Sequence, residues 1–367
     1  MLVPGLLLSL LFGAVAPSPA VRIQASSQDV RPVRIASTAF GRRLEIEVRD
    51  LPRETARAAI QSALDEVSAV ERLLKPDVSE PAGGTGGVGG IGSLNAAAGH
   101  GPQPVDPKLM PLLVRAQEFC FWSEGAHGPL GRNLYEAWGL RSATSEAKPE
   151  VGSDGPAPSA AVLPEPGTLQ EATAEAKCES LVLDPAKDTA ELAAGSRLDL
   201  GGFAEGHAVD QAIETLRQNG VANGFVQIGS IQRGLGKGVD GRGWKIILPR
   251  FTGMDRPAGR FQLRDRAAAV LTTQDGSMRI ADQVLLPYLN QRTGLPAPGV
   301  IGVAAVTDLA VDAQALAIAM VLTGPREGQL RLGSLRPSPS VLWFLGSGSG
   351  APLQADHHWG DVIAASR

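Results

Sequence analysis

The segment that most constrains the fold lies at residues 198–210, where a strand-like stretch ends in Gly201 and Gly202 and enters an amphipathic helix. Glycines at such a turn let the backbone approach a ligand closely and leave N–H groups at the positive end of the helix. This arrangement can hold a phosphate. It also suits a plain strand-to-helix turn in which glycine only provides a positive φ. The spacing alone leaves both interpretations open.

The other predicted elements mix helices with strands. Hydrophobic side chains repeat with the period of a helix at residues 53–74, 106–122, 204–219 and 310–322, and a short helix is predicted at 168–176. Apolar alternation or short apolar runs predict strands at residues 44–48, 180–183, 225–228, 244–248, 261–263, 300–306 and 341–345. Because the two kinds of element do not alternate strictly, the sequence predicts the α+β class rather than a doubly wound sheet.

Composition narrows the function classes. The net charge of −4 gives no reason to expect binding to nucleic acid or to an anionic membrane through charge. The apolar content of 43% is enough for a core, which argues against global disorder. Glycine is concentrated at residues 81–92, and residues 141–167 are rich in Ser, Pro, Ala and Glu, so we interpret residues 77–92 and 141–167 as flexible insertions. The sequence motifs of α/β-hydrolases, zinc peptidases and P-loop proteins are absent.

The N-terminus predicts an export signal at residues 1–20, followed by a polar lead-in at 21–33. Residues 2–16 are uncharged and mostly apolar, shorter than the roughly 20 residues of a membrane span, and small residues follow at 18–20. No Lys or Arg precedes this run, so an uncleaved anchor and a cytosolic chain stay as alternatives. We expect an exported protein, periplasmic or extracytoplasmic. Export would permit a disulfide between Cys120 and Cys178, with two buried free thiols as the alternative.

Several short motifs, in their order along the chain, carry a resemblance to a known family. They are Phe40-Gly41-Arg42, residues 71–74, residues 93–95, residues 124–128, Trp138-Gly139, residues 199–210, residues 226–230, residues 292–296 and Gly324-Pro325. Together they resemble the FAD:protein FMN transferase (ApbE-like) family, and residues 199–210 are the closest match. The resemblance implies one large domain at residues 34–350, built of mixed, mainly antiparallel sheets flanked by helices in a T-fold-like arrangement. Residues 351–367 are then expected to be a tail.

The family resemblance implies a magnesium-dependent reaction on an exported partner. A Ser or Thr hydroxyl of a target protein attacks the flavin-side phosphorus of FAD, AMP leaves, and FMN stays joined to the target. FAD and Mg²⁺ are the implied cofactors; a flavin nucleotide and an exported acceptor protein are the implied partners. Peripheral association with a membrane is compatible with this picture. The nucleotide is assigned to Phe40, Ala126, His127, Gly128, Asp199, Glu205 and Thr272.

The positions that the resemblance assigns to the metal depart from the family pattern. They are the backbone of Gly202 and the side chains of Gln314 and Ile318, where the family has an Asp and a Thr. Asp312 is a candidate substitute, although two residues along a helix turn a side chain by about 200°. Gly128 stands in place of an acid of the flavin pocket. Most of these changes remove a charge or a ligating oxygen.

Three hypotheses follow: an active transferase with an altered metal site, a non-catalytic protein that binds flavin nucleotide or a partner, and a scaffold whose pocket is filled by side chains. We expect reduced or lost catalysis. Arg42 and Arg43 near the predicted pocket could attract phosphate, or could lie on a solvated strand edge. All three hypotheses require Gly201, Gly202 and the final helix to flank one cavity.

Overall fold

The central sheet sets the architecture of the molecule. The computed structural model describes residues 31–75, 89–140, 159–346 and 350–365. Within these ranges one sheet has eight strands, in the order β1-β2-β7-β8-β11-β14-β15-β16, and every neighbouring pair is antiparallel. The strands are β1 (Val33–Ala39), β2 (Arg42–Val48), β7 (Gly224–Ile228), β8 (Ile231–Leu235), β11 (Ala267–Thr272), β14 (Val300–Thr307), β15 (Ser340–Leu345) and β16 (Leu353–His357).

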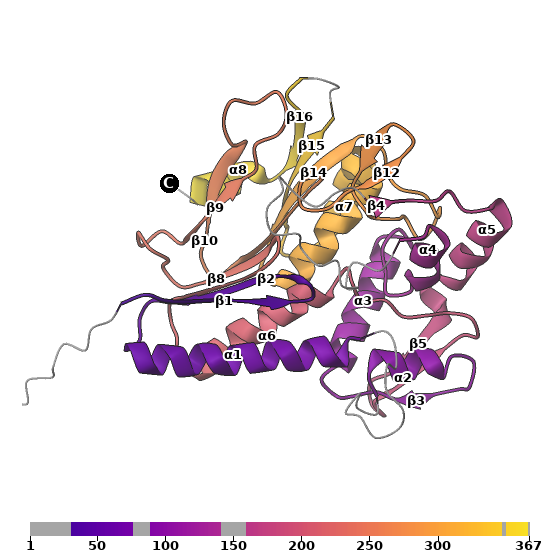
Figure 1. Ribbon diagram of the computed structural model, residues 1–367, viewed down its shortest axis with the longest axis horizontal. Coiled ribbons are helices and arrows are strands. Elements are labelled where there is room, and N and C mark those ends of the chain that lie inside the picture. The colour runs from indigo at the N-terminus through magenta and orange to yellow at the C-terminus, as the bar shows by residue number, and fades with distance from the viewer. Residues whose placement is uncertain (1–30, 76–88, 141–158, 347–349, 366–367) are drawn as a thin grey trace, which may run out of the picture.

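Helices pack on one face of this sheet (Figure 1). The long helices are α1 (Arg53–Leu73), α6 (Ala204–Gln218) and α7 (Ala310–Leu332). Their apolar stripes bury the inward side chains of the strands, such as Ile46 and Trp343, both 0% exposed. Helix α7 bends at Gly324, whose φ is 66°, immediately before Pro325. The helix predicted for 310–322 is therefore the first part of a longer, kinked helix.

The opposite face of the sheet carries a smaller core, closed by three elements: β9 (Trp244–Leu248), β10 (Gly259–Leu263) and α8 (Trp359–Ala365). Trp359 and Val362 of α8 are buried there. The prediction that residues 351–367 form a tail is therefore wrong for the described residues, because they form β16 and α8. The segment folds because β16 pairs with β15 and α8 covers Phe261, whose ring centroid lies 5.3 Å from that of Trp359.

Short elements beside the helical layer complete the molecule. They are α2 (Ile91–Ala96), β3 (Gln103–Pro104), α3 (Met110–Trp122), α4 (Arg132–Ala137), β4 (Ser159–Ala160), α5 (Pro166–Glu175), the 3₁₀ helix η1 (Cys178–Ser180), β5 (Leu181–Asp184), β6 (Thr189–Leu192), β12 (Met278–Ile280) and β13 (Gln283–Leu285). Cys120 at the end of α3 forms a disulfide with Cys178 in η1, with a Cα–Cα distance of 5.7 Å. The alternative of two free thiols is therefore excluded.

The predicted α+β class and the mainly antiparallel sheets are confirmed. Within residues 159–167 of the second predicted insertion, the structure has β4 and the start of α5. Helix α5 begins at Pro166, because proline is favoured at the first helical position. The rest of that insertion, most of the insertion at 77–92 and the predicted signal at 1–20 lie outside the described residues. Among the helices that the structure does describe, none combines the length and the hydropathy of a bilayer-spanning helix.

Candidate functional site

Helices α6 and α7 meet at the turn that the sequence singles out. A Cβ placed on Gly206 would lie 2.5 Å from the carbonyl oxygen of Ala310 and 2.6 Å from Cα of Val311, so only glycine permits this approach. The contact brings the start of α7 against the first turn of α6. The required proximity of Gly201, Gly202 and the final helix is therefore present in the fold.

Gln314 of α7 joins this turn through its side-chain amide. Its Oε1 accepts a hydrogen bond from the backbone N–H of Gly206 at 2.8 Å. Its Nε2 donates to the carbonyl oxygen of Gly201 at 3.1 Å and to Oε2 of Glu205. The residue is 3% exposed. The predicted metal position is thus occupied by an amide group that bonds to the residues around it.

His127 and Ile318 fill the space above Gly202. A Cβ on Gly202 would lie 2.3 Å from Cε1 of His127 and 3.2 Å from Cδ1 of Ile318. The imidazole stacks on Phe203, with centroids 4.8 Å apart and an interplanar angle of 7°. Burial lowers the pKa of His127 to about 4, while an interaction with the Gly202 backbone opposes part of that shift. The ring is therefore neutral near pH 7 and packs as an uncharged group.

The cavity that is left at this place is small. Its volume is about 20 Å³, and it is lined by His127, Gly128, Gly131, Tyr135, Asp199, Gly201, Gly202, Tyr288, Gln291 and Ile318. A single water needs roughly 10–15 Å³ by this kind of measure. The space therefore suits one or two waters and is far below the several hundred cubic ångströms of an ordinary ligand pocket.

Besides His127, the predicted nucleotide residues Asp199 and Gly128 line this cavity. Oδ1 of Asp199 accepts a hydrogen bond from the backbone N–H of Gly201 at 2.8 Å, which stabilises the glycine turn. A Cβ on Gly128 would lie 2.5 Å from Sγ of Cys120. The disulfide therefore occupies the space into which a side chain at position 128 would project, and glycine is required there.

The other predicted residues lie around the cavity rather than in it. Ala126 is fully buried, and its carbonyl oxygen accepts a hydrogen bond from the N–H of Gln291 at 3.1 Å. Phe40 is 4% exposed, and its N–H donates to Oε1 of Glu71 at 2.9 Å. Thr272 donates its hydroxyl to Oδ2 of Asp275 at 2.7 Å. These contacts are structural, and none places a polar side chain in the cavity.

Arg42 links this outer group to the buried acid of the turn. It donates from Nη1 to the carbonyl oxygen of Asp275 at 2.9 Å. Burial raises the pKa of Glu205, and the positive charge of Arg42 opposes that shift. Arg43 instead pairs with Glu45 on the strand and is 74% exposed. Of the two arginines, only Arg42 bears on the predicted site.

Three further side chains line the cavity and were not predicted from the sequence: Tyr135, Tyr288 and Gln291. Burial raises the pKa of both tyrosines, so their hydroxyls stay protonated. Tyr288 and Gln291 lie just before the motif at residues 292–296, and that closeness in sequence is the signal that could have found them. Tyr135 lies in α4, for which no periodic pattern was apparent.

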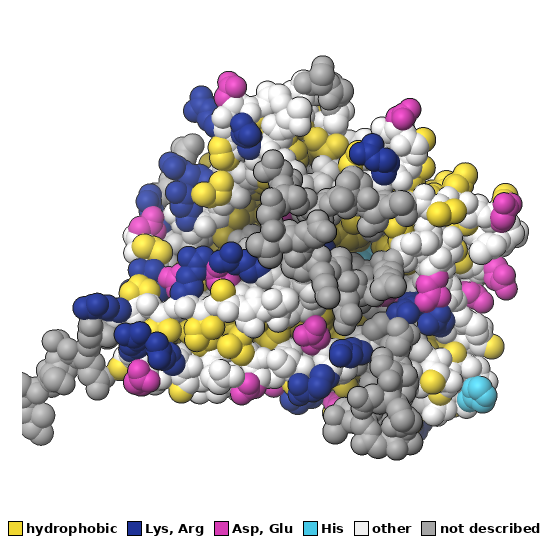
Figure 2. Space-filling model, viewed as in Figure 1, with side chains coloured by type: hydrophobic (Ala, Val, Ile, Leu, Met, Phe, Trp, Pro, Cys, Tyr) yellow, Lys and Arg dark blue, Asp and Glu magenta, His cyan; other side chains and the backbone are white. Residues whose placement is uncertain are grey.

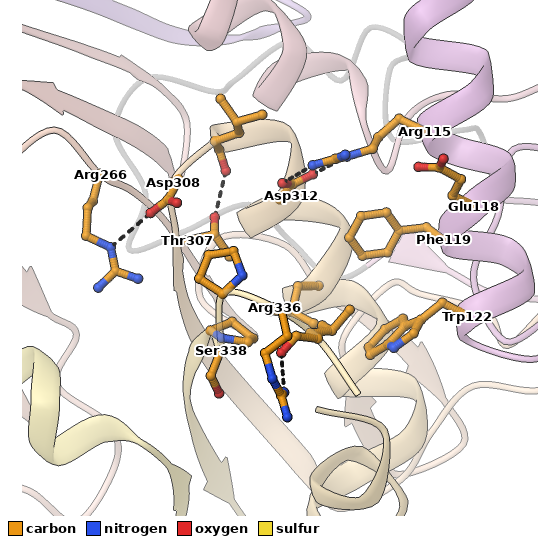
Figure 3. Close-up of a pocket in the computed structure, with 15 residues that line it drawn as sticks. Arg115, Glu118, Phe119, Trp122, Arg266, Thr307, Asp308, Asp312, Arg336 and Ser338 are labelled. Carbon is orange, nitrogen blue, oxygen red and sulfur yellow. Dashed lines mark hydrogen bonds and ion pairs between the residues drawn. The ribbon is translucent and has the colours of Figure 1, made fainter. Parts of the chain in front are cut away.

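Asp312 does not substitute for Gln314. It forms a bidentate ion pair with Arg115 of α3, in which Nε of Arg115 lies 2.6 Å from Oδ1 (Figure 3). The two side chains line a separate cavity of about 360 Å³, walled also by Phe119 and Trp122. The prediction that Asp312 substitutes as a metal ligand is therefore wrong. Asp312 and Gln314 are two residues apart along α7, so their side chains lie on different sides of the helix. In the part of the chain that the structure describes, no three His, Cys, Asp or Glu residues are grouped so as to hold a metal ion.

Comparison of the sequence with known proteins finds relatives that share one name. A chain named FAD:protein FMN transferase from Rhodobacter capsulatus is 26% identical over 294 residues, covering 78% of this chain and 51% of the relative. One of the same name from Treponema pallidum (strain Nichols) is 29% identical over 252 residues, covering 63% of this chain and 64% of the relative. The chain thus spans between half and two thirds of the length of these relatives.

Solved structures show the same architecture. The ApbE protein of Thermotoga maritima superposes with a TM-score of 0.74 at 18% identity, covering 92% of this chain and all of that one. The flavin transferase ApbE of Vibrio cholerae superposes with a TM-score of 0.71 at 19% identity, covering 89% and 97%. The ApbE family model matches residues 40–340. Because that match extends over most of the sequence, the chain belongs to the ApbE family.

Proposed function

We propose that this chain is a non-catalytic member of its family, a scaffold for a partner protein that keeps the transferase fold without magnesium-dependent transfer of FMN. One observation carries the proposal: among the residues that the structure describes, His127 and Ile318 fill the space at Gly202 and leave a cavity of about 20 Å³. An isoalloxazine ring cannot enter a space of that size.

The side chains at this turn do not fit Mg²⁺. That ion needs oxygen ligands in near-octahedral geometry. Gln314 presents an N–H group toward Gly201 and Glu205, and Ile318 presents a methyl group toward Gly202. Transfer of a phosphoryl-type group depends on positioning and on stabilisation of developing charge. Loss of one such stabilising contact costs about 10²–10³ in rate. Because both Gln314 and Ile318 lack a ligating oxygen directed at Gly201 or Gly202, we expect transfer too slow for turnover.

The proposal includes export to an oxidising compartment. The disulfide between Cys120 and Cys178 supports it, because such bonds persist outside the reducing cytosol. The apolar run at residues 2–16 supports it as well. A partner protein would then be an exported protein. On the face shown in Figure 2, Lys and Arg side chains lie among Asp and Glu side chains over α1, which favours no strongly charged partner.

A second candidate function is flavin-nucleotide binding without transfer. Arg42 favours it, because its guanidinium lies near Asp275 and Glu205 beside the cavity and could attract a phosphate group at the surface. Asp199 would support that binding indirectly, by holding the Gly201 turn. This function needs no metal.

The test is an assay for AMP release. The chain is incubated with FAD, Mg²⁺ and an exported flavin-acceptor protein, with an active flavin transferase as positive control. We expect no AMP and no quenching of FAD fluorescence. AMP release that depends on a divalent cation would overturn the proposal. Quenching without AMP, weakened in Arg42→Ala, would establish the second candidate instead.

A further inference from the structure

Two acceptor oxygens converge on one buried point at the start of α6. They are the carbonyl oxygen of Gly201 and Oε2 of Glu205, and Glu205 is 6% exposed. Nε2 of Gln314 occupies that point and donates to both. A buried acceptor left without a donor is costly, so something must always fill this position.

The orientation of the Gln314 amide follows from its third contact. The backbone N–H of Gly206 can only donate, so the group facing it at 2.8 Å is the amide oxygen. The amide nitrogen must then face Gly201 and Glu205. A flipped amide would set two donors against each other at Gly206 and two acceptors against each other at Glu205. All three contacts therefore agree on one arrangement.

The chemistry around Nε2 is that of a cation site. Carbonyl and carboxylate oxygens are the ligands that hard cations take from proteins. The amide N–H group carries a partial positive charge and directs it at the same two oxygens. The remaining charge of Glu205 is balanced by Arg42, which acts on it from the start of β2. The two acceptor oxygens are therefore satisfied by the Gln314 amide without an ion.

We infer that Gln314 is a built-in replacement for a divalent cation, so that the turn is complete without metal. This rests on the proposed function, in which no Mg²⁺ is held at this turn. It adds that one exchange, Gln314→Glu, converts a donor into an acceptor of the same shape. Three oxygen groups would then face one point with excess negative charge, and the turn would come to depend on a bound cation.

Thermal unfolding in EDTA and in Mg²⁺, Mn²⁺ or Ca²⁺ tests the inference. The melting temperature of the unaltered chain should be the same in all four solutions. Gln314→Glu should melt roughly 5–10 °C lower in EDTA, because it leaves a buried charge uncompensated. Saturating divalent cation should restore most of that loss, and calorimetric titration should show one cation site in this variant alone.

Two control variants separate the causes. Gln170→Glu makes the same chemical change at an exposed position of α5 and should behave as the unaltered chain does. Gln314→Met keeps the length of the side chain and removes its hydrogen bonds, so it should be destabilised with no response to cations. If Gln314→Glu does not fold, the unaltered chain and Gln314→Met still decide the matter.

Three results would overturn the inference. One is a saturable rise in the melting temperature of the unaltered chain with a divalent cation, lost in Gln314→Met. Another is a Gln314→Glu variant as stable in EDTA as the unaltered chain. The last is a destabilised Gln314→Glu that no cation rescues. AMP release is measured separately: activity through a cation bound elsewhere would overturn the proposed function and leave these melting results as they are.

Discussion

At the scale of single residues, the site is defined by which side chains fill it. Glycine is required at position 202 because a Cβ there would collide with the imidazole of His127. Glycine is required at position 128 because a Cβ there would collide with Sγ of Cys120. Each filled space is matched by a glycine on a different segment, and such complementarity is a property of the packed core rather than of either segment alone.

His127 should make stability depend on pH. Its pKa is lowered by burial from 6.5 to about 4 in the folded protein. Between these values the unfolded chain binds more protons, so the free energy of unfolding falls as pH falls, by about 3 kcal/mol at pH 4. In His127→Asn this part of the loss should vanish. Urea unfolding at pH 7 and pH 4 measures it.

The contribution of His207, whose pKa burial also lowers to about 4, is common to both proteins and cancels in the comparison. Equal losses of stability in the unaltered chain and in His127→Asn would contradict the account of His127 as a buried neutral ring.

At the scale of elements, helix α6 determines where α7 begins. Asp210 of α6 accepts hydrogen bonds from the N–H groups of Ala310 and Val311, at 2.9 and 3.0 Å, and pairs with Arg233 of β8. A carboxylate at the first turn satisfies orphan N–H groups and suits the positive end of the helix. Gly206 permits the close approach itself. These contacts place Gln314 beside the Gly201 turn.

Gly206→Ala should therefore destabilise the protein. Within a helix, alanine gains about 1 kcal/mol over glycine. Here the added Cβ would lie 2.5 Å from the carbonyl oxygen of Ala310, and we expect a net loss of about 2 kcal/mol. Gly167→Ala in α5 is the matched control, because nothing lies within 4 Å of its Cβ position. A denaturant midpoint for Gly206→Ala at or above that of Gly167→Ala would refute this account of the α6–α7 contact.

At the scale of the whole molecule, the central sheet separates two cores. The larger core lies against α1, α6 and α7, and the smaller one lies under β9, β10 and α8. The C-terminal segment closes the smaller core and also pairs with β15 at the edge of the sheet. A chain that ended at residue 350 would expose both an apolar surface and an unpaired strand edge.

Truncation after residue 350 should consequently lower the melting temperature and promote aggregation. Trp359→Ala isolates the packing part of the effect, with an expected loss of about 3–5 kcal/mol, because the indole is 7% exposed against Phe261. Light scattering during thermal unfolding compares the two variants with the full chain. A truncated chain that melts and stays soluble like the full one would show that the smaller core needs no C-terminal cover.

Prediction from the sequence succeeded for elements with a clear apolar period or a distinct apolar run, and it missed several elements that have neither. The strand predicted at 244–248 matches β9, and the helix predicted at 204–219 matches α6 within one residue. Strand β11 was missed because it is buried on both faces and starts with three alanines, which carry no alternation. The fold at residues 353–365 was missed because Trp359 is one large side chain in a polar segment, and one contact makes no pattern.

The sequence by itself determined the α+β class, and the resemblance of its motifs led us to expect that the Gly201 turn lies near the final helix and that Gln314 and Ile318 stand where the family has an Asp and a Thr. The class follows from local periodicity, and the two expectations follow from the resemblance of the motifs to the family. Only the tertiary structure decided that His127 fills the space over Gly202, that Asp312 pairs with Arg115 and that the Gln314 amide bonds to Gly201 and Glu205. Each of these contacts joins segments far apart in the chain, and local sequence preferences carry no information about which distant side chain will occupy a shared space.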